Sequence, residues 1–287
     1  MNGILLIDKP SGMTSHGVVA RARRILGERK IGHAGTLDPL ATGVLVLLVG
    51  RATKLSDFLL NKEKCYRAGI LLGCETDTYD IEGTVLHRCE PQVSREQLCA
   101  VLEQFTGVQQ QLPPMYSAVK QNGKKLYELA RAGQEVERQP REITVHRLSL
   151  LSYDGVRAEA EISCSKGTYI RTLAHDIGQA LGCGACLDSL RRTASGAFAA
   201  EQAISLASLE AGEYSLLPTH SVFPYPAVTV TGKEAERIRN GTGFVSSLAP
   251  GDYKLFSEEG AFLCTARAEV RARGCYLQPV TMFLEER

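Results

Sequence analysis

The sequence contains no apolar run long enough to cross a membrane. Residues 44–49 are continuously apolar, but a membrane helix needs ~20 such residues, so this run is typical of a buried strand. The apolar residues 4–7 are followed at once by Asp8 and Lys9, which makes this stretch too short for a secretion signal. We therefore expect a cytoplasmic protein without a membrane partner.

The common cofactor-binding motifs are missing as well. Residues 27–32 have the glycine spacing of a Walker loop, but His33 and Ala34 stand where Lys and Ser or Thr are required. The glycines of residues 182–187 lack the third small residue of a dinucleotide fingerprint. The nine cysteines are scattered, and the CxxC at residues 183–186 has no second pair at zinc-ribbon spacing. The sequence predicts no nucleotide, redox or metal cofactor.

What is present is an ordinary globular composition with an uneven charge distribution. The 287 residues, 44% hydrophobic and 23% charged, suffice for one large domain and a small appendage. The net charge is +1, yet residues 1–64 carry ten Lys and Arg against five Asp and Glu, whereas residues 65–110 carry three against seven. The first segment could face a polyanion, although a solvated charged surface would have the same composition.

Apolar periodicity and capping residues predict a mixture of strands and helices. The expected strands are residues 4–7, 44–49, 66–72 and 156–164, and the expected helices begin at Thr14 or Ser15, near Thr53, at Ser94 with its capping-box partner Gln97, and at Thr168. These elements do not follow a regular βαβ rhythm. An α+β fold around a mixed sheet is therefore favoured over a doubly wound parallel sheet.

A cluster of prolines divides the chain near Phe223. Residues 223–287 then continue as short strand-like runs with one helical piece at residues 233–240. The predicted domains are thus residues 1–222 and a small β-rich module at 223–287.

Residues 109–141 form a long polar excursion from the core. Between Lys120 and Arg141 six Lys and Arg face three Glu, and only residues 125–132 are amphipathic. Loops of this length in compact domains are commonly functional, so the basic excess favours a substrate-gripping element over a surface insertion.

The segment GHAGTLDPLATG, residues 32–43, presents a single carboxylate. Its three glycines permit tight turns, and Pro39 fixes the chain directly after Asp38. Beside a buried strand, such a carboxylate needs a cation or several hydrogen-bond donors. Asp38 is a candidate catalytic residue, although the spacing alone favours an aspartate that caps its own turn.

Arg171 lies in the first turn of the helix predicted after Thr168. The helix dipole disfavours a cation there, so Asp38 or an RNA phosphate could be its anionic partner; an exposed guanidinium is the alternative. Tyr66 and Tyr169 could stack on bases, although a tyrosine at a strand start is commonly half-buried packing.

Six sequence blocks together carry a family resemblance. They are LLIDKPSGMTS (5–15), GHAGTLDPLATGVL (32–45), KCYRAGILLG (64–73), PPMYSAVK (113–120), CSKGTYIRTLAHDIG (164–178) and LRRTASGAF (190–198). With these six blocks in this order, the chain resembles the TruB family, the bacterial tRNA pseudouridine-55 synthases. The resemblance implies a pseudouridine synthase fold with a central mixed, mainly antiparallel sheet flanked by helices and loops. KEAERIRNG (233–241) resembles part of a PUA-type RNA-binding domain.

The resemblance also implies a role for individual residues. Asp38 matches the family's catalytic aspartate, Arg171 the arginine paired with it, and Tyr66 the tyrosine that stacks on the target base. His33 matches a histidine that touches flipped-out RNA, and Leu190 a hydrophobic contact at the pocket.

Further matches concern structure and RNA binding. Lys9 and Pro10 match a first motif whose role is mainly structural. Residues 120–141 resemble a thumb-like loop that folds over RNA. We also expect Lys120 and Tyr169 to contact the RNA.

The implied reaction is the isomerisation of the T-loop uridine 55 of tRNA after base flipping. The C1'–N1 bond breaks and a C1'–C5 bond forms without a cofactor, while Asp38 attacks the sugar, adds to the uracil ring or removes the 2'-proton. The expected partner is the tRNA T-stem-loop, and a monomer without a protein partner is expected. The alternatives are a non-catalytic RNA-binding protein and a nucleoside or glycoside hydrolase, although no second catalytic carboxylate is evident.

Overall fold

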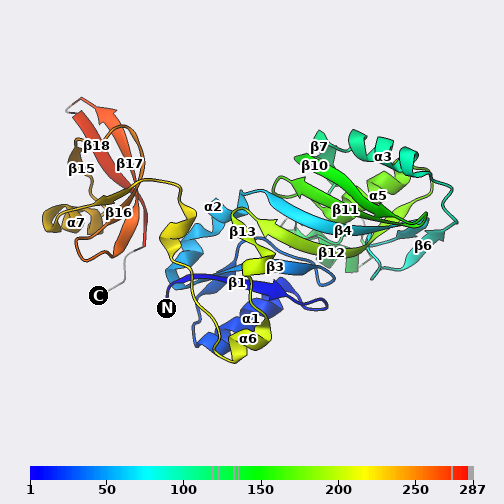
Figure 1. Ribbon diagram of the computed structural model, residues 1–287, viewed down its shortest axis with the longest axis horizontal. Coiled ribbons are helices and arrows are strands. Elements are labelled where there is room, and N and C mark those ends of the chain that lie inside the picture. Colours follow the sequence, from blue (N-terminus) through cyan, green and yellow to red (C-terminus); the bar gives the residue numbers. More distant parts are fainter. Residues whose placement is uncertain (118, 122, 132, 135, 273, 284–287) are drawn as a thin grey trace.

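The chain forms a large α+β body and a smaller lobe built from its C-terminal part (Figure 1). The computed structural model describes residues 1–117, 119–121, 123–131, 133–134, 136–272 and 274–283. No helix among these residues is long and apolar enough to span a membrane.

A nine-stranded sheet organises the body, with the path β1-β3-β12-β4-β11-β10-β7 and with β2 and β13 attached to β3 and β12. Its strands are β1 (Gly3–Lys9), β2 (Ile31–His33), β3 (Thr42–Val49), β4 (Lys64–Leu72), β7 (Gly107–Gln111), β10 (Arg141–Tyr153), β11 (Arg157–Cys164), β12 (Ala185–Ser195) and β13 (Phe198–Ala199). Only β12 and β3 run parallel, with Arg191 and Arg192 opposite Thr42 and Gly43. The predicted mixed, mainly antiparallel sheet is confirmed.

Helices and short strands surround this sheet. They are α1 (Ser15–Leu26), η1 (Gly50–Leu55), α2 (Ser56–Leu60), α3 (Arg95–Gln104), α4 (Leu126–Arg131), α5 (Ile170–Ala180), η2 (Ala200–Gln202), α6 (Leu206–Glu210) and η3 (Thr219–Val222), with the hairpins β5 (Cys74–Thr76) to β6 (Val85–Arg88) and β8 (Lys120–Gln121) to β9 (Lys124–Lys125). Thr14 caps α1, because its side chain accepts a hydrogen bond from the Gly17 N–H. The predicted capping box of Ser94 and Gln97 at α3 is present.

The start of α5 differs from the prediction that Thr168 caps it. Tyr169 occupies the N-cap, and the Thr168 hydroxyl instead donates to the Ser165 carbonyl, 3.0 Å away. The Gln111 side chain accepts from the Tyr169 N–H at 2.8 Å and donates to the Tyr169 carbonyl at 3.0 Å. A long-range amide therefore replaces the local cap, which no sequence pattern near Thr168 could indicate.

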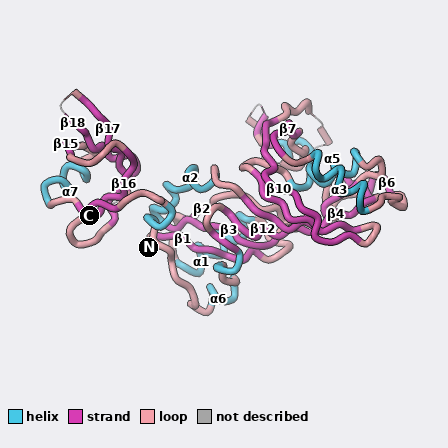
Figure 2. Tube along the Cα trace, turned by 45° about the horizontal axis from the view of Figure 1, so that its top comes forward, coloured by secondary structure: helices cyan, strands magenta, loops and turns pink. Residues whose placement is uncertain are grey.

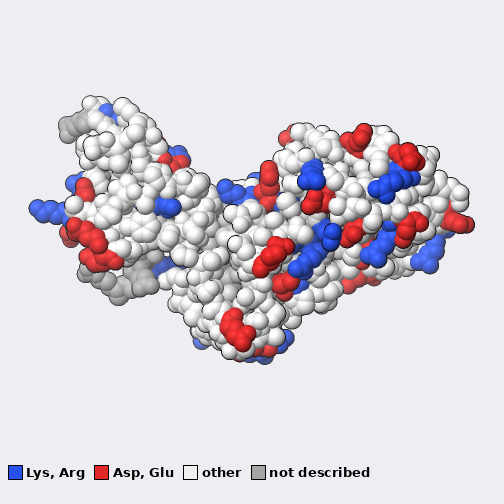
Figure 3. Space-filling view, viewed as in Figure 1, with Lys and Arg blue, Asp and Glu red and all other residues white. Residues whose placement is uncertain are grey.

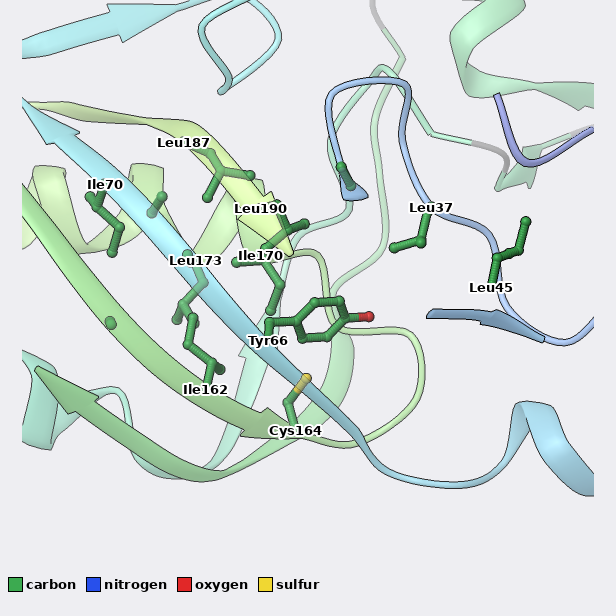
Figure 4. Packing of buried hydrophobic residues seen from close by; sticks show 14 of the residues in the cluster. Leu37, Leu45, Tyr66, Ile70, Ile162, Cys164, Ile170, Leu173, Leu187 and Leu190 are labelled. Atoms are coloured by element: carbon green, nitrogen blue, oxygen red, sulfur yellow. The ribbon is translucent and has the colours of Figure 1, made fainter. Parts of the chain in front are cut away.

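The main core lies between the inner face of the sheet and α5. Alternate residues of β4 and β11, among them Ile70 and Ile162, point inward, and Leu173 of α5 packs on them (Figure 4). This alternation arises because successive strand side chains point to opposite faces. It also places Tyr66 on the inner face, next to α5.

The basic excursion starts later than the sequence predicts. Residues 109–111 belong to β7, which pairs with β10 so that Gln111 lies opposite Arg141. The two ends of the excursion are thus joined at the sheet edge, and α4 matches the predicted amphipathic piece. Residues 118, 122, 132 and 135 lie outside the described part, as do the side chains of Lys120, Gln121, Lys124, Lys125, Tyr127 and Arg131.

The C-terminal lobe has its own sheet and core (Figure 2). The sheet has the order β14-β16-β17-β18-β15, formed by β14 (Ala227–Thr229), β15 (Phe244–Ser246), β16 (Gly251–Phe256), β17 (Phe262–Arg271) and β18 (Gly274–Met282), with the helix α7 (Gly232–Arg239). It also packs on the body: the Phe58 and Phe223 rings are 4.9 Å apart, and Lys54 Nζ donates to the Met282 carbonyl at 2.7 Å.

Candidate active site

Contacts from β1 and α1 fix the loop that carries Asp38. Lys9 Nζ donates to the Pro39 carbonyl at 3.1 Å, directly after the carboxylate. The Ser15 hydroxyl accepts from the Leu37 N–H at 2.8 Å and donates to the Leu37 carbonyl at 2.9 Å. The residues on both sides of Asp38 are therefore held by neighbouring elements.

Lys9 itself is fully buried. Its ammonium group also donates to the Pro10 and Met13 carbonyls, and burial lowers its pKa to about 8, against the opposing effect of the Asp38 charge. These contacts agree with a structural role for Lys9, because a lysine is buried without loss only when its donors are satisfied.

Arg192 ties the two ends of the same loop together. Its side chain is 1% exposed, and it donates from Nε to the Val44 carbonyl at 2.8 Å and from Nη2 to the Gly35 carbonyl at 3.2 Å. Close approach explains Gly43, whose φ is +97° and where a Cβ would lie 2.2 Å from the Arg192 carbonyl oxygen. No sequence pattern near Arg192 indicates this role.

Asp38 and Arg171 form an ion pair. Arg171 Nε lies 2.9 Å from Asp38 Oδ2, and the side chains are 5% and 38% exposed respectively. Of the two anions considered for Arg171, Asp38 is the one that the fold supplies. The carboxylate remains open to solvent on one side, where a substrate can reach it.

Further partners surround the Arg171 guanidinium. Nη1 donates to the Thr78 carbonyl at 3.1 Å and Nη2 to the Tyr116 carbonyl at 3.0 Å. The buried Asp80 carboxylate lies 3.4 Å from Nη1 and accepts from the Thr78 hydroxyl at 2.7 Å. Asp80 was missed because it falls in an acidic, turn-rich stretch that is typical of solvated surface.

Tyr66 and Leu190 belong to the same core cluster as Leu37 and Ile170, the residues that precede Asp38 and Arg171. Tyr66 is 8% exposed, and burial raises its pKa to about 12, while the charge of Arg192 acts in the opposite direction. Figure 4 shows the Tyr66 hydroxyl pointing toward the loop of Leu37, with Leu190 and Ile170 near the ring. The fold thus brings an aromatic face and an aliphatic side chain close to the Asp38 loop.

The other three residues predicted to contact RNA are His33, Tyr169 and Lys120. His33 ends β2, and its pKa is lowered by burial and by the charges of Arg192 and His16, which favours the neutral imidazole. Tyr169 is half-buried, and desolvation raises its pKa. Lys120 belongs to β8, but its side chain lies outside the described part.

The described residues contain no group of three or more His, Cys, Asp or Glu that could hold a metal ion. Of the two carboxylates next to Arg171, Asp80 is buried and Asp38 is partly exposed, so the site offers one accessible carboxylate, oriented by a permanent cation, beside a tyrosine ring. Such a group can act as a nucleophile or as a base.

Comparison with solved structures identifies the fold. The structure of an H/ACA RNP bound to a substrate RNA containing 2'-deoxyuridine matches 99% of this chain and 85% of that chain, with a TM-score of 0.70 and 23% identity. A Cbf5-Nop10-Gar1 complex matches 98% of this chain and 85% of that chain, with a TM-score of 0.70 and 25% identity.

Family comparison is more specific. Residues 23–170 match the N-terminal domain of the TruB family pseudouridylate synthases, and residues 171–217 match the C-terminal domain of tRNA pseudouridylate synthase B. The chain is therefore a pseudouridine synthase, an isomerase. It belongs to the TruB family, which confirms the resemblance found in the sequence.

Curated relatives agree with this assignment. The tRNA pseudouridine synthase B of Azoarcus sp. (strain BH72) is 51% identical over 247 residues, which cover 84% of this chain and 82% of the relative. That of Syntrophotalea carbinolica is 46% identical over 248 residues, which cover 84% and 81%.

Proposed function

We propose that this protein converts the T-loop uridine 55 of tRNA into pseudouridine, with Asp38 as the catalytic carboxylate. The observation that carries the proposal is the 2.9 Å contact between Arg171 and Asp38, in which a buried cation orients a partly exposed anion. The curated relatives, named for pseudouridine synthesis in tRNA, support the substrate class.

The reaction is balanced without any second reactant. The C1'–N1 bond breaks, the uracil turns, a C1'–C5 bond forms, and the proton lost from C5 is matched by one gained at N1. Asp38 can attack C1', add to the uracil ring or remove the 2'-proton, and each route uses an ionised carboxylate. Arg171 complements that ionised form because its guanidinium is always charged.

A uridine within a folded T loop must leave its stack before a protein carboxylate can reach it. In the proposed complex Tyr66 stacks on the flipped base and Leu190 packs against it, since both belong to the core cluster that includes Leu37, the residue before Asp38. His33 and Tyr169 contact the RNA around the flipped nucleotide, and Lys120 binds its backbone from the basic excursion.

The proposed division of labour follows the two lobes. Residues 1–222 perform catalysis, the segment between β7 and β10 (residues 112–140) acts as a thumb-like RNA-binding insertion, and residues 223–287 form a PUA-like RNA-binding module. The separate five-stranded sheet and core of the C-terminal lobe support this division. The protein acts as a cytoplasmic monomer on the T-stem-loop.

The test is incubation with an unmodified tRNA transcript, followed by carbodiimide labelling and mass spectrometric mapping. We expect pseudouridine at position 55 alone. Asp38→Asn, which keeps the shape of the side chain, should bind the transcript but lower turnover by at least about 10³-fold. Free uracil would indicate a hydrolase, and binding without product would indicate a non-catalytic RNA-binding protein.

A further inference from the structure

The loop of residues 78–80 contacts one nitrogen of Arg171 at two points. The Thr78 carbonyl accepts from Nη1 at 3.1 Å, and the Asp80 carboxylate lies 3.4 Å from the same nitrogen. Between them, Tyr79 has a φ of +63°, which makes it the only described non-glycine residue with a positive φ. A left-handed conformation costs a residue with a Cβ roughly 1–2 kcal/mol, so surrounding contacts must maintain it.

The Tyr79 ring provides one such contact. It stacks on the imidazole of His175, with ring centroids 4.0 Å apart and an interplanar angle of 14°. His175 follows Arg171 by four residues on α5, so it lies one turn further along the same face of the helix. Its Nδ1 is buried and has no hydrogen-bond partner among the described residues, which leaves stacking as a principal contact of this ring.

The loop is also hydrogen-bonded to β12. The Leu187 N–H of β12 donates to the Tyr79 carbonyl at 3.0 Å, and the Ile81 N–H donates to the Leu187 carbonyl at 2.9 Å. β12 is the strand that carries Leu190 and Arg192. Tyr79 therefore connects the helix of Arg171 with the strand that holds the ends of the Asp38 loop.

We propose that Tyr79 and His175 are positioning residues for Arg171. Their stack fixes the 78–80 loop on α5, so that Thr78 and Asp80 both meet Nη1 and the guanidinium presents Nε to Asp38. This inference rests on the proposed function, in which the Asp38–Arg171 pair serves the isomerisation. Without the stack the loop can shift, the guanidinium turns, and the carboxylate loses its orientation.

The first experiment removes the ring and keeps the backbone. Tyr79→Asn suits this purpose because asparagine tolerates the left-handed conformation, and Tyr79→Phe is the matched control that retains the ring. We expect Tyr79→Asn to lower kcat on the tRNA transcript by about 10-fold, with KM within about twofold, since a small misplacement of a catalytic group has effects of this size. Tyr79→Phe should retain the wild-type rate.

The same comparison applies to the partner ring. His175→Gln should reproduce the loss of kcat, and His175→Phe should retain activity because it keeps the stacking surface. The double variant Tyr79→Asn/His175→Gln should lose no more kcat than either single variant, since both substitutions remove the same stacking contact. If Tyr79→Asn does not fold, the two His175 variants decide the question by the same criteria.

The Tyr79–His175 stack could stabilise the fold without affecting Arg171. The same Tyr79 substitution in the Arg171→Lys variant distinguishes this role from positioning. In Arg171→Lys, Tyr79→Asn should cost less than about twofold in single-turnover rate, because its effect acts through the guanidinium. An equal loss in both backgrounds, or a kcat of Tyr79→Asn within about twofold of wild type, overturns the positioning role. An active Asp38→Asn rejects the proposed function itself, whereas an inactive Asp38→Asn with an unaffected Tyr79→Asn rejects only the positioning role.

Discussion

The two faces of the main sheet differ sharply at β4, where Tyr66 and Arg67 are neighbours in sequence. Tyr66 points inward to the core, and its neighbour Arg67 points outward to Glu159, 3.2 Å away, with the two side chains 58% and 40% exposed. Figure 3 shows Lys and Arg intermixed with Asp and Glu over the body. The arginines near the site, Arg171 and Arg192, are almost completely buried.

Burial changes what an arginine contributes. An exposed ion pair is worth roughly 0–1 kcal/mol, because water already solvates both groups and both side chains lose freedom. A buried guanidinium that donates to backbone carbonyls is different, since its loss leaves those acceptors unsatisfied. The outer face should therefore tolerate substitution, whereas the inner arginines should control geometry and rate.

Arg171→Lys should give the largest effect in this comparison. Lysine keeps the charge but has one nitrogen, whereas the Arg171 guanidinium donates from three nitrogens to Asp38, Thr78 and Tyr116. We expect kcat to fall by about 10²-fold, with the fold and tRNA binding retained. Single-turnover rates and circular dichroism test this, and a rate near wild type would mean that the charge alone suffices.

Arg192→Lys should combine a smaller loss of rate with a loss of stability. Arg192 meets the Val44 and Gly35 carbonyls with two separate nitrogens, Nε and Nη2, and a lysine has one nitrogen that cannot occupy both positions. We therefore expect about 2 kcal/mol of destabilisation in urea unfolding and about a 10-fold lower kcat. The adjacent Arg191, half-exposed and paired with Asp8, offers the matched control. Equal effects of Arg191→Lys and Arg192→Lys would contradict a special role for the buried residue.

Tyr66→Phe tests the inner face by pH. Burial raises the pKa of Tyr66 from 10.0 to about 12, so its hydroxyl stays protonated up to pH 10. The ratio of wild-type to Tyr66→Phe kcat should therefore be constant between about pH 7 and 10. Because the unfolded phenol ionises first, the wild type should lose stability relative to Tyr66→Phe as pH rises from 10 toward 12. A ratio that changes with an apparent pKa near 8 would place an ionised Tyr66 in the reaction.

Local signals predicted the elements, whereas long-range contacts determined the details of the site. Thr14 and the pair Ser94–Gln97 mark helix starts within a few residues, so the sequence alone suffices for them. A cation in the first turn of a helix indicates an anionic partner for Arg171, although the partner, Asp38, lies 133 residues away. Nothing near Asp80 indicates its burial, because only the fold brings its loop to α5.

Arg192 shows the same limit. Its importance comes from the order of the sheet, in which β12 lies between β3 and β4 and runs parallel to β3. A single sequence reveals strand periodicity but not which strands become neighbours. Arg191 and Arg192 therefore look equivalent in the sequence, although one is half-exposed and the other is buried.

Arg67→Ala, which changes an exposed arginine of the outer face, should give the smallest effect on stability and rate. It removes the exposed pair with Glu159, and we expect a change in unfolding free energy below about 0.5 kcal/mol. Rate and tRNA affinity should stay at wild-type values. Each arginine of these ion pairs is neutralised by its own carboxylate partner, so this face does not attract phosphates. Urea unfolding and tRNA binding at two salt concentrations measure both quantities. A weaker, less salt-dependent binding by Arg67→Ala would show that tRNA also touches the outer face, and the contrast between the two faces would then concern catalysis but not recognition.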